Sequence, residues 1–268
     1  IPQYDLYYNS VRSESSSAFQ LFSATLELFQ QPSEGWFQIG NPLDGDLATD
    51  KDVTGMMFSM IGPMLVLVFL FSGCMAVAPE SIAGEKERGT FATMLVTPVK
   101  RSHIAIGKII ALSTLSLISG ICSFLGIILS LPKLVGGTGN ISATVYTASD
   151  YIMLLGIVLS SVLVIVALIS LISAFAKSVK EATNMIGPLM ILVVLLGVST
   201  MFTSGSAGAF FWYLIPLYNS ARAMSGIFSF AASPLNVIIT IASNLVVALL
   251  LAFALAKMFD NEKIMFNK

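Results

Sequence analysis

The sequence has few charged residues. Asp, Glu, Lys and Arg make up 11% of its 268 residues, whereas about a quarter of the residues in a soluble domain are charged. Hydrophobic residues account for 56%, and the mean hydropathy is +0.86. Several apolar runs reach the roughly twenty residues that a helix needs to cross a bilayer. The composition therefore argues against a soluble globular protein and predicts an integral membrane protein.

The residue patterns of common catalytic and nucleotide-binding sites are also missing. His103 is the single histidine, which excludes an H-E-x-x-H zinc site, and there is no G-x-S-x-G elbow. Gly107-Lys108 is followed by Ile109, and no glycine stands five positions before Gly107, so there is no P-loop. Both cysteines lie within apolar runs. We expect no enzyme activity, metal or cofactor in this chain, and without a basic run we expect no nucleic-acid partner.

Five apolar stretches predict an all-α membrane protein, with residues 53–257 as its transmembrane domain. The predicted spans cover residues 53–77, 104–131, 151–176, 183–202 and 235–256. No acidic residue lies at the centre of these spans, where a carrier driven by protons or sodium usually places one. No motif typical of an ion-selective filter is present. These absences argue against a secondary transporter or a channel.

The first fifty residues differ from the rest of the chain because they are polar. Alternation over Tyr4–Tyr8 is a weak strand signal, and apolar residues at helical spacing predict an amphipathic helix over residues 13–31. A loop rich in proline, glycine and aspartate follows. We expect residues 1–52 to lie outside the bilayer, as the end of a larger loop domain, and a further span to precede Ile1.

Residues 209–230 are apolar but contain proline, asparagine and arginine. They form either a sixth span or, as we favour, two short helices that meet near Pro216 and re-enter the outer leaflet. With this arrangement the basic residues divide ten inside against four outside, which is a positive-inside bias. The tail, residues 258–268, is then cytoplasmic.

Small and polar residues recur on one face of several predicted spans. The simpler interpretation is that they let helices pack closely in lipid. The alternative is that they line a transport path. The candidates for such a lining are Ser113, Ser116, Ser123, Asn184, Asn236, Thr240 and Asn244.

Charges cluster between two long apolar runs in the stretch 79–108. Acidic and basic residues from Glu80 to Arg88 are followed by the apolar anchors Phe91 and Leu95. This pattern predicts a short amphipathic helix at the membrane surface, over about residues 80–96. A turn at Thr97-Pro98 then leads back into the bilayer.

This stretch resembles the signature of the type-2 ABC-exporter permease family, E-x-E-x-G-T-x-E-x-L-L-x-[TS]-P-V followed by G-K. The matching residues are Glu85, Glu87, Gly89, Thr90, Leu95, Thr97, Pro98, Val99, Gly107 and Lys108. One position departs from the signature, because Ala92 stands where the family has a second acid. With the polar N-terminal segment and the Pro-Leu-Tyr-Asn-Ser run at 216–220, the chain is most similar to the NatB-type sodium-extrusion branch.

The resemblance implies a permease that forms a homodimer or pairs with another permease. It also implies that ATP is bound by a separate ABC ATPase subunit, and that the helix at 80–96 is the coupling helix that docks on this ATPase. The residues expected to take part in coupling are Glu80, Glu85, Glu87, Arg88, Gly89, Thr90, Phe91 and Leu95.

We therefore expect this chain to be the permease subunit of an ATP-driven exporter. Its location would be the cell membrane, which is the inner membrane of a bacterium. Its substrate is either Na⁺ or a drug-like or peptide molecule. One alternative is a membrane-embedded enzyme such as an intramembrane protease, which would need a catalytic set within the spans. Another is a non-transporting anchor or sensor, which would need neither polar faces on several spans nor a docking element.

Overall fold

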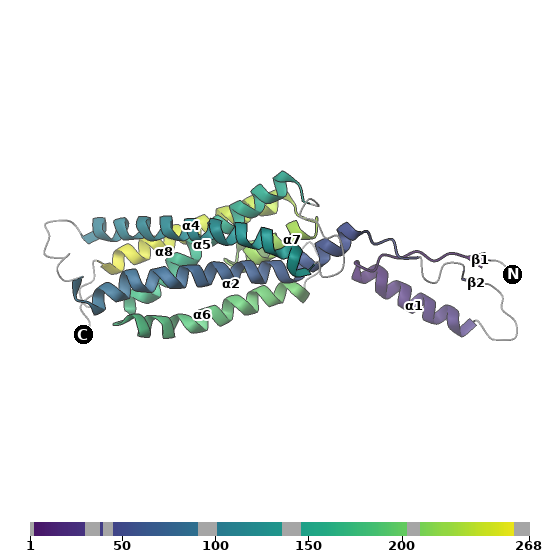
Figure 1. Ribbon diagram of the computed structural model, residues 1–268, viewed down its shortest axis with the longest axis horizontal. Helices are drawn as coiled ribbons and strands as arrows, with labels where there is room; N and C mark the ends of the chain where they lie inside the picture. The colour runs from purple at the N-terminus through teal and green to yellow at the C-terminus, as the bar shows by residue number, and fades with distance from the viewer. Residues whose placement is uncertain are drawn as a thin grey trace. The chain divides into compact units, whose positions relative to one another are not determined.

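The computed structural model describes residues 3–29, 38–39, 45–90, 101–135, 146–202 and 210–259 (Figure 1). The chain divides into two compact units, Ile1–Met57 and Phe58–Lys268, and each is described by itself.

The first unit contains one amphipathic helix and a short pair of strands. β1 (Gln3–Tyr4) runs parallel to β2 (Gln38–Ile39), so the strand signal of the sequence covers only two residues. α1 (Ser13–Phe29) begins where the predicted helix begins. Its Phe19 ring stacks on Tyr8, with the ring centroids 3.9 Å apart. The Asp46 carboxylate accepts hydrogen bonds from Ser10 and Ala48, which lower its pKa.

Five helices in the described residues are long and apolar enough to cross a membrane. They are α2 (Asp50–Glu87), α4 (Arg101–Val135), α5 (Ala148–Phe175), α6 (Val179–Ser199) and α8 (Pro234–Phe259). This confirms the prediction of an α-helical protein with five apolar helices. A two-residue strand pair is the exception to the all-α class.

α2 extends further than the sequence predicted. We expected a span that ends at Val77 and a separate helix from about residue 80, but α2 continues through Pro79 to Glu87. Proline removes one backbone donor and usually ends or kinks a helix, but α2 runs on through Pro79. With 38 residues α2 is about 57 Å long, well over the roughly 30 Å of a bilayer core. The rest of the predicted coupling helix, including Phe91 and Leu95, lies outside the described residues.

α5 forms the centre of the second unit. It is apolar on all sides, as expected of a buried helix, and it packs against α4, α6 and α8. Small residues allow the close approach. A Cβ atom added at Gly120 of α4 would lie 2.8 Å from Val162 of α5, and one at Gly156 of α5 would lie 3.0 Å from Ile241 of α8. Glycine at these two positions therefore lets the helices approach closely, as small residues do in membrane helix packing.

Two short helical segments lie between α6 and α8. After the 3₁₀ turn η2 (Thr200–Phe202), the described chain resumes with η3 (Phe210–Leu214) and α7 (Tyr218–Phe228). α7 has 11 residues and is about 16 Å long, too short to cross a bilayer. This agrees with two short helices that meet near Pro216. At their junction the buried Leu217 has a φ of +68°, an unusual conformation for a residue with a Cβ atom.

Candidate functional site

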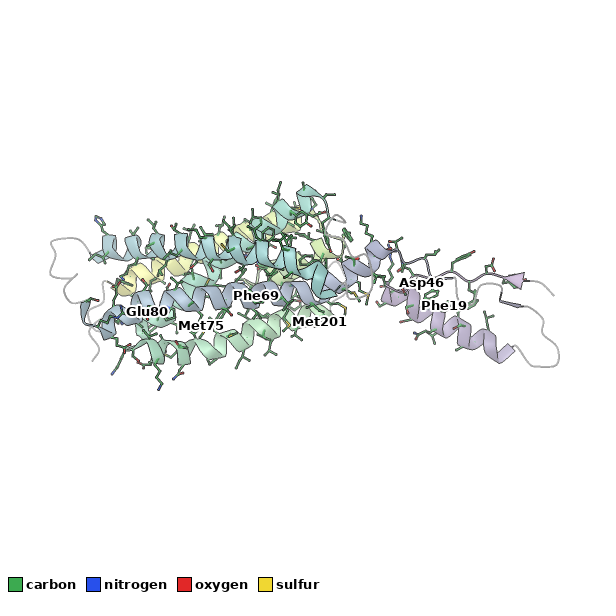
Figure 2. All side chains as sticks on the ribbon, viewed as in Figure 1. Phe19, Asp46, Phe69, Met75, Glu80 and Met201 are labelled. Atoms are coloured by element: carbon green, nitrogen blue, oxygen red, sulfur yellow. The ribbon has the colours of Figure 1, made fainter. Side chains whose placement is uncertain are left out.

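The charged signature forms the last turns of α2, near Glu80 (Figure 2). Gly89 ends the helix with a φ of +73°, a left-handed conformation that glycine adopts without strain. Its N–H donates to the carbonyl oxygen of Lys86 at 3.1 Å. The Thr90 hydroxyl donates to the carbonyl oxygen of Glu85 at 3.2 Å. The sequence Gly89-Thr90 thus satisfies carbonyls that the end of a helix leaves without partners.

The first interhelical contact of this segment joins α2 to α4. The Lys108 ammonium forms an ion pair with Glu85 Oε2 and also donates to the carbonyl oxygen of Ser81 at 2.8 Å. The side chain of Lys108 is 11% exposed and that of Glu85 is 24% exposed. A half-buried pair is screened less than one in open water, so the contact holds the start of α4 against the end of α2.

Two further contacts join α2 to the connection between α5 and α6. Lys86 Nζ donates to the carbonyl oxygen of Ala174, in the last turn of α5. The backbone N–H of Val179, the first residue of α6, donates to Glu87 Oε2 at 2.9 Å. A carboxylate at a helix N-terminus and an ammonium at a C-terminus both complement the helix dipole. We call Glu85, Lys86, Glu87 and Lys108 the helix clamp, because they join one end of α2 to α4, α5 and α6.

Other residues at this end remain on the surface. Arg88 pairs with Glu80, but their side chains are 65% and 48% exposed. Exposed pairs contribute little to stability, typically about 0–1 kcal/mol. Gly89 and Thr90 are exposed as well. Some predicted coupling residues are therefore exposed and can contact a partner while the helix clamp stays intact. They are Glu80, Arg88, Gly89 and Thr90.

The structure changes the interpretation of the two signature acids. Glu85 and Glu87 were expected to contact an ATPase, and both have partners on other helices of this chain. Lys86 was not predicted to be a site residue, and no partner was predicted for Lys108. The spacing of Ser81 and Glu85 was an available indication of this contact. They are four residues apart and share one face of a helix, so one cation can reach both.

The candidate lining residues differ in how exposed they are. Thr240 and Asn244 of α8 are fully buried, and Ser116 is almost so. Ser113, Ser123 and Asn236 are partly exposed and Asn184 is exposed. The seven side chains therefore differ in their surroundings, and their role as a transport lining stays a prediction.

Thr240 and Asn244 belong to a buried polar cluster where α5, α7 and α8 meet. Asn244 Nδ2 donates to Ser160 Oγ at 3.1 Å and to Ser220 Oγ at 2.8 Å. Ser161 Oγ lies 2.8 Å from Ser220 Oγ. Ser160 and Ser161 come from α5, and Asn219 and Ser220 come from α7, which was not predicted to be part of a site. We define the polar cluster as Ser160, Ser161, Asn219, Ser220, Thr240 and Asn244.

Comparison with known proteins assigns this helical bundle to a class. The family model described as "ABC-2 family transporter protein" matches residues 3–263. The chain belongs to this family of ABC-2 transporter permeases, and it is a multi-pass membrane protein.

A curated relative is the ABC transporter permease protein NatB of Bacillus subtilis (strain 168). The two are 30% identical over 234 residues, which cover 80% of this chain and 59% of NatB. The chain thus spans less than two thirds of the length of this relative.

Proposed function

We propose that the permease exports its substrate with energy from ATP that a separate ABC ATPase subunit hydrolyses. The sequence contains no P-loop, so the energy would have to enter through a contact with another chain. The helix clamp is the observation that supports this proposal. An ATPase that displaced the end of α2 would move the ends of α4, α5 and α6 with it, because these helices are joined there.

In this proposal the ATPase contacts the exposed end of α2 and the residues that follow it. Glu80, Arg88, Gly89 and Thr90 would form the described part of the contact, and Phe91 and Leu95 would extend it. The clamp end would face the cytoplasm, as the distribution of basic residues favours. A second permease copy would complete the transporter in the bacterial inner membrane. Na⁺ and a drug-like or peptide molecule are the two substrate classes proposed from the sequence.

The test is reversal of one exposed charge. We expect Arg88→Glu in the full-length chain to reduce the amount of ATPase that co-purifies with the permease. Lys180→Glu is the matched control, because Lys180 is also an exposed cation at this end, in the first turn of α6. Normal ATPase binding and normal transport-coupled hydrolysis with Arg88→Glu would show that the end of α2 is not the docking site.

A further inference from the structure

The polar cluster contains hydrogen-bonding atoms that its own residues leave unused. The hydroxyl of Ser160 donates to the carbonyl oxygen of Ile157 at 2.9 Å. Its oxygen can therefore only accept a hydrogen bond from Asn244, which places the Asn244 NH₂ group toward Ser160. The amide orientation is thus set by its surroundings. The other end of the amide, Oδ1, has no partner among the described residues.

A second unused group lies one helical turn away. The Thr240 hydroxyl is fully buried on the same face of α8 as Asn244, and it too lacks a partner among the described residues. Buried polar groups are nearly always hydrogen-bonded, because loss of water without replacement is unfavourable. Two such groups on adjacent turns of one helix indicate that something else supplies the missing partners.

The electrostatics of the cluster favour an uncharged ligand. The unused amide oxygen is an acceptor, so it would repel an anion. A cation is also disfavoured by the helix dipole of α7. The N-terminus of α7, where Asn219 and Ser220 lie, adds a partial positive charge. A neutral N–H or O–H group satisfies the acceptor without these penalties.

An apolar cavity in the same α5–α8 interface indicates what else the ligand contains. The cavity has a volume of about 140 Å³ and also borders α4. The residues of the polar cluster do not line it, but its walls include Leu163, one turn along α5 from Ser160, and Leu245, the residue after Asn244. The remaining walls are mostly aliphatic, with Ser113 and Ser170 as the polar exceptions. A cavity of about this size lined by aliphatic side chains accepts a benzene-sized group. An amino-acid side chain such as that of leucine or phenylalanine is comparable in size.

We propose that the polar cluster is a binding site for an uncharged, mostly apolar molecule that donates an N–H hydrogen bond, such as a hydrophobic peptide. A backbone N–H would donate to Asn244 Oδ1, the Thr240 hydroxyl would bind a second polar group, and an apolar side chain would occupy the cavity. This assignment rests on the proposed transport function in one respect, namely that the ligand is the exported substrate. Between the two substrate classes, it selects the peptide and not Na⁺.

The experiment measures ligand-induced stabilisation of the purified full-length chain, with no ATPase present. The probe is N-acetyl-leucyl-leucine amide, and its analogue with every amide nitrogen methylated is the donor-free control. Because a ligand that binds only the folded state raises the midpoint of thermal denaturation, we expect a saturable rise with the probe and none with the analogue. Replacement of choline chloride by NaCl should not raise the midpoint of thermal denaturation.

Two isosteric variants separate binding from folding. Thr240→Val should abolish the shift caused by the probe, and the ligand-free midpoint should stay the same or rise because an unpaired buried hydroxyl is lost. Thr114→Val is the matched control, since Thr114 is exposed on α4 and donates within its own helix to Ile110 at 2.8 Å. It should retain the full shift.

Three outcomes would overturn the proposal. The first is no stabilisation by the probe, or equal stabilisation by its methylated analogue. The second is a sodium-specific shift that Thr240→Val abolishes, which would make the cluster a cation site. The third is a fall in the ligand-free midpoint of Thr240→Val, which would make the hydroxyl a structural group. None of these results depends on whether an ATPase docks on α2, so the two proposals can fail separately.

Discussion

The ion pair between Glu85 and Lys108 provides the sharpest test of the helix clamp. Lys108→Met retains most of the length of the side chain but removes its charge and its donors. Glu85 would then lie partly buried without its cation, and the carbonyl of Ser81 would lose the ammonium hydrogen bond. We therefore expect a large effect from a single conservative change at the end of the bundle.

The size of this effect follows from the exposure of the pair. Breaking a fully buried ion pair costs about 3–5 kcal/mol, and an exposed pair contributes about 0–1 kcal/mol. With side chains 11% and 24% exposed, the pair lies between these limits, so we expect a cost of about 2 kcal/mol. In a chain of this size, this corresponds to a fall of about 4–8 °C in the midpoint of thermal denaturation.

A double-mutant cycle on purified permease measures the contact itself. Glu85→Gln combined with Lys108→Met should recover part of the loss, because neither charge then remains unpaired, and the coupling energy should be about 1–2 kcal/mol. The matched control is Glu80→Gln with Arg88→Met, the exposed pair on the same helix. Strictly additive changes at Glu85 and Lys108, or equal effects at the two pairs, would refute the clamp.

Three further predictions concern single positions. Gly89→Ala should lower the free energy of unfolding by about 1–2 kcal/mol, because Gly89 has a φ of +73°. Gly107→Ala should be neutral or stabilising, because Gly107 lies inside α4 with open space around it. Thermal denaturation of both variants checks this. Glu87→Ala should uncouple ATP hydrolysis from transport in vesicles while Glu87→Gln keeps partial coupling, because only the amide still accepts the α6 hydrogen bond; equal coupling in both would contradict it. Tyr146→Phe removes the buried hydrogen bond of 3.0 Å from the Tyr146 hydroxyl to the carbonyl oxygen of Phe228. This loss should cost about 1–2 kcal/mol and lower the midpoint of thermal denaturation by a few degrees. Tyr7→Phe, at an exposed position, should leave the midpoint unchanged.

The helix clamp offers a physical reason for the spacing of the signature. Three consecutive residues, Glu85, Lys86 and Glu87, point in different directions around a helix because each residue turns it by about 100°. They can therefore contact α4, α5 and α6 separately. Gly89 then ends the helix two residues later. In this arrangement one short run both gathers the helices and starts the segment that is proposed to meet the ATPase.

Several features could be predicted from the sequence because they depend on local composition. The five apolar runs require helices, since a backbone in lipid must satisfy its own hydrogen bonds. The helix that begins at Ser13 follows from its apolar spacing. Pro216 interrupts residues 209–230, and the structure contains two short helical segments there. The E-x-E-x-G-T signature indicated the family, which the match over residues 3–263 confirms.

Other features depend on contacts between residues far apart in the sequence. No local rule shows that α2 continues past Pro79, because a proline is tolerated only where surrounding contacts hold the helix. Glu87 and Val179 are 92 residues apart, and Asn244 and Ser160 are 84 apart. Such contacts exist only once the helices have packed. The sequence could therefore name the charged stretch near Glu85, but only the packed bundle turns Glu85 and Glu87 toward neighbouring helices and gathers the polar cluster in its core.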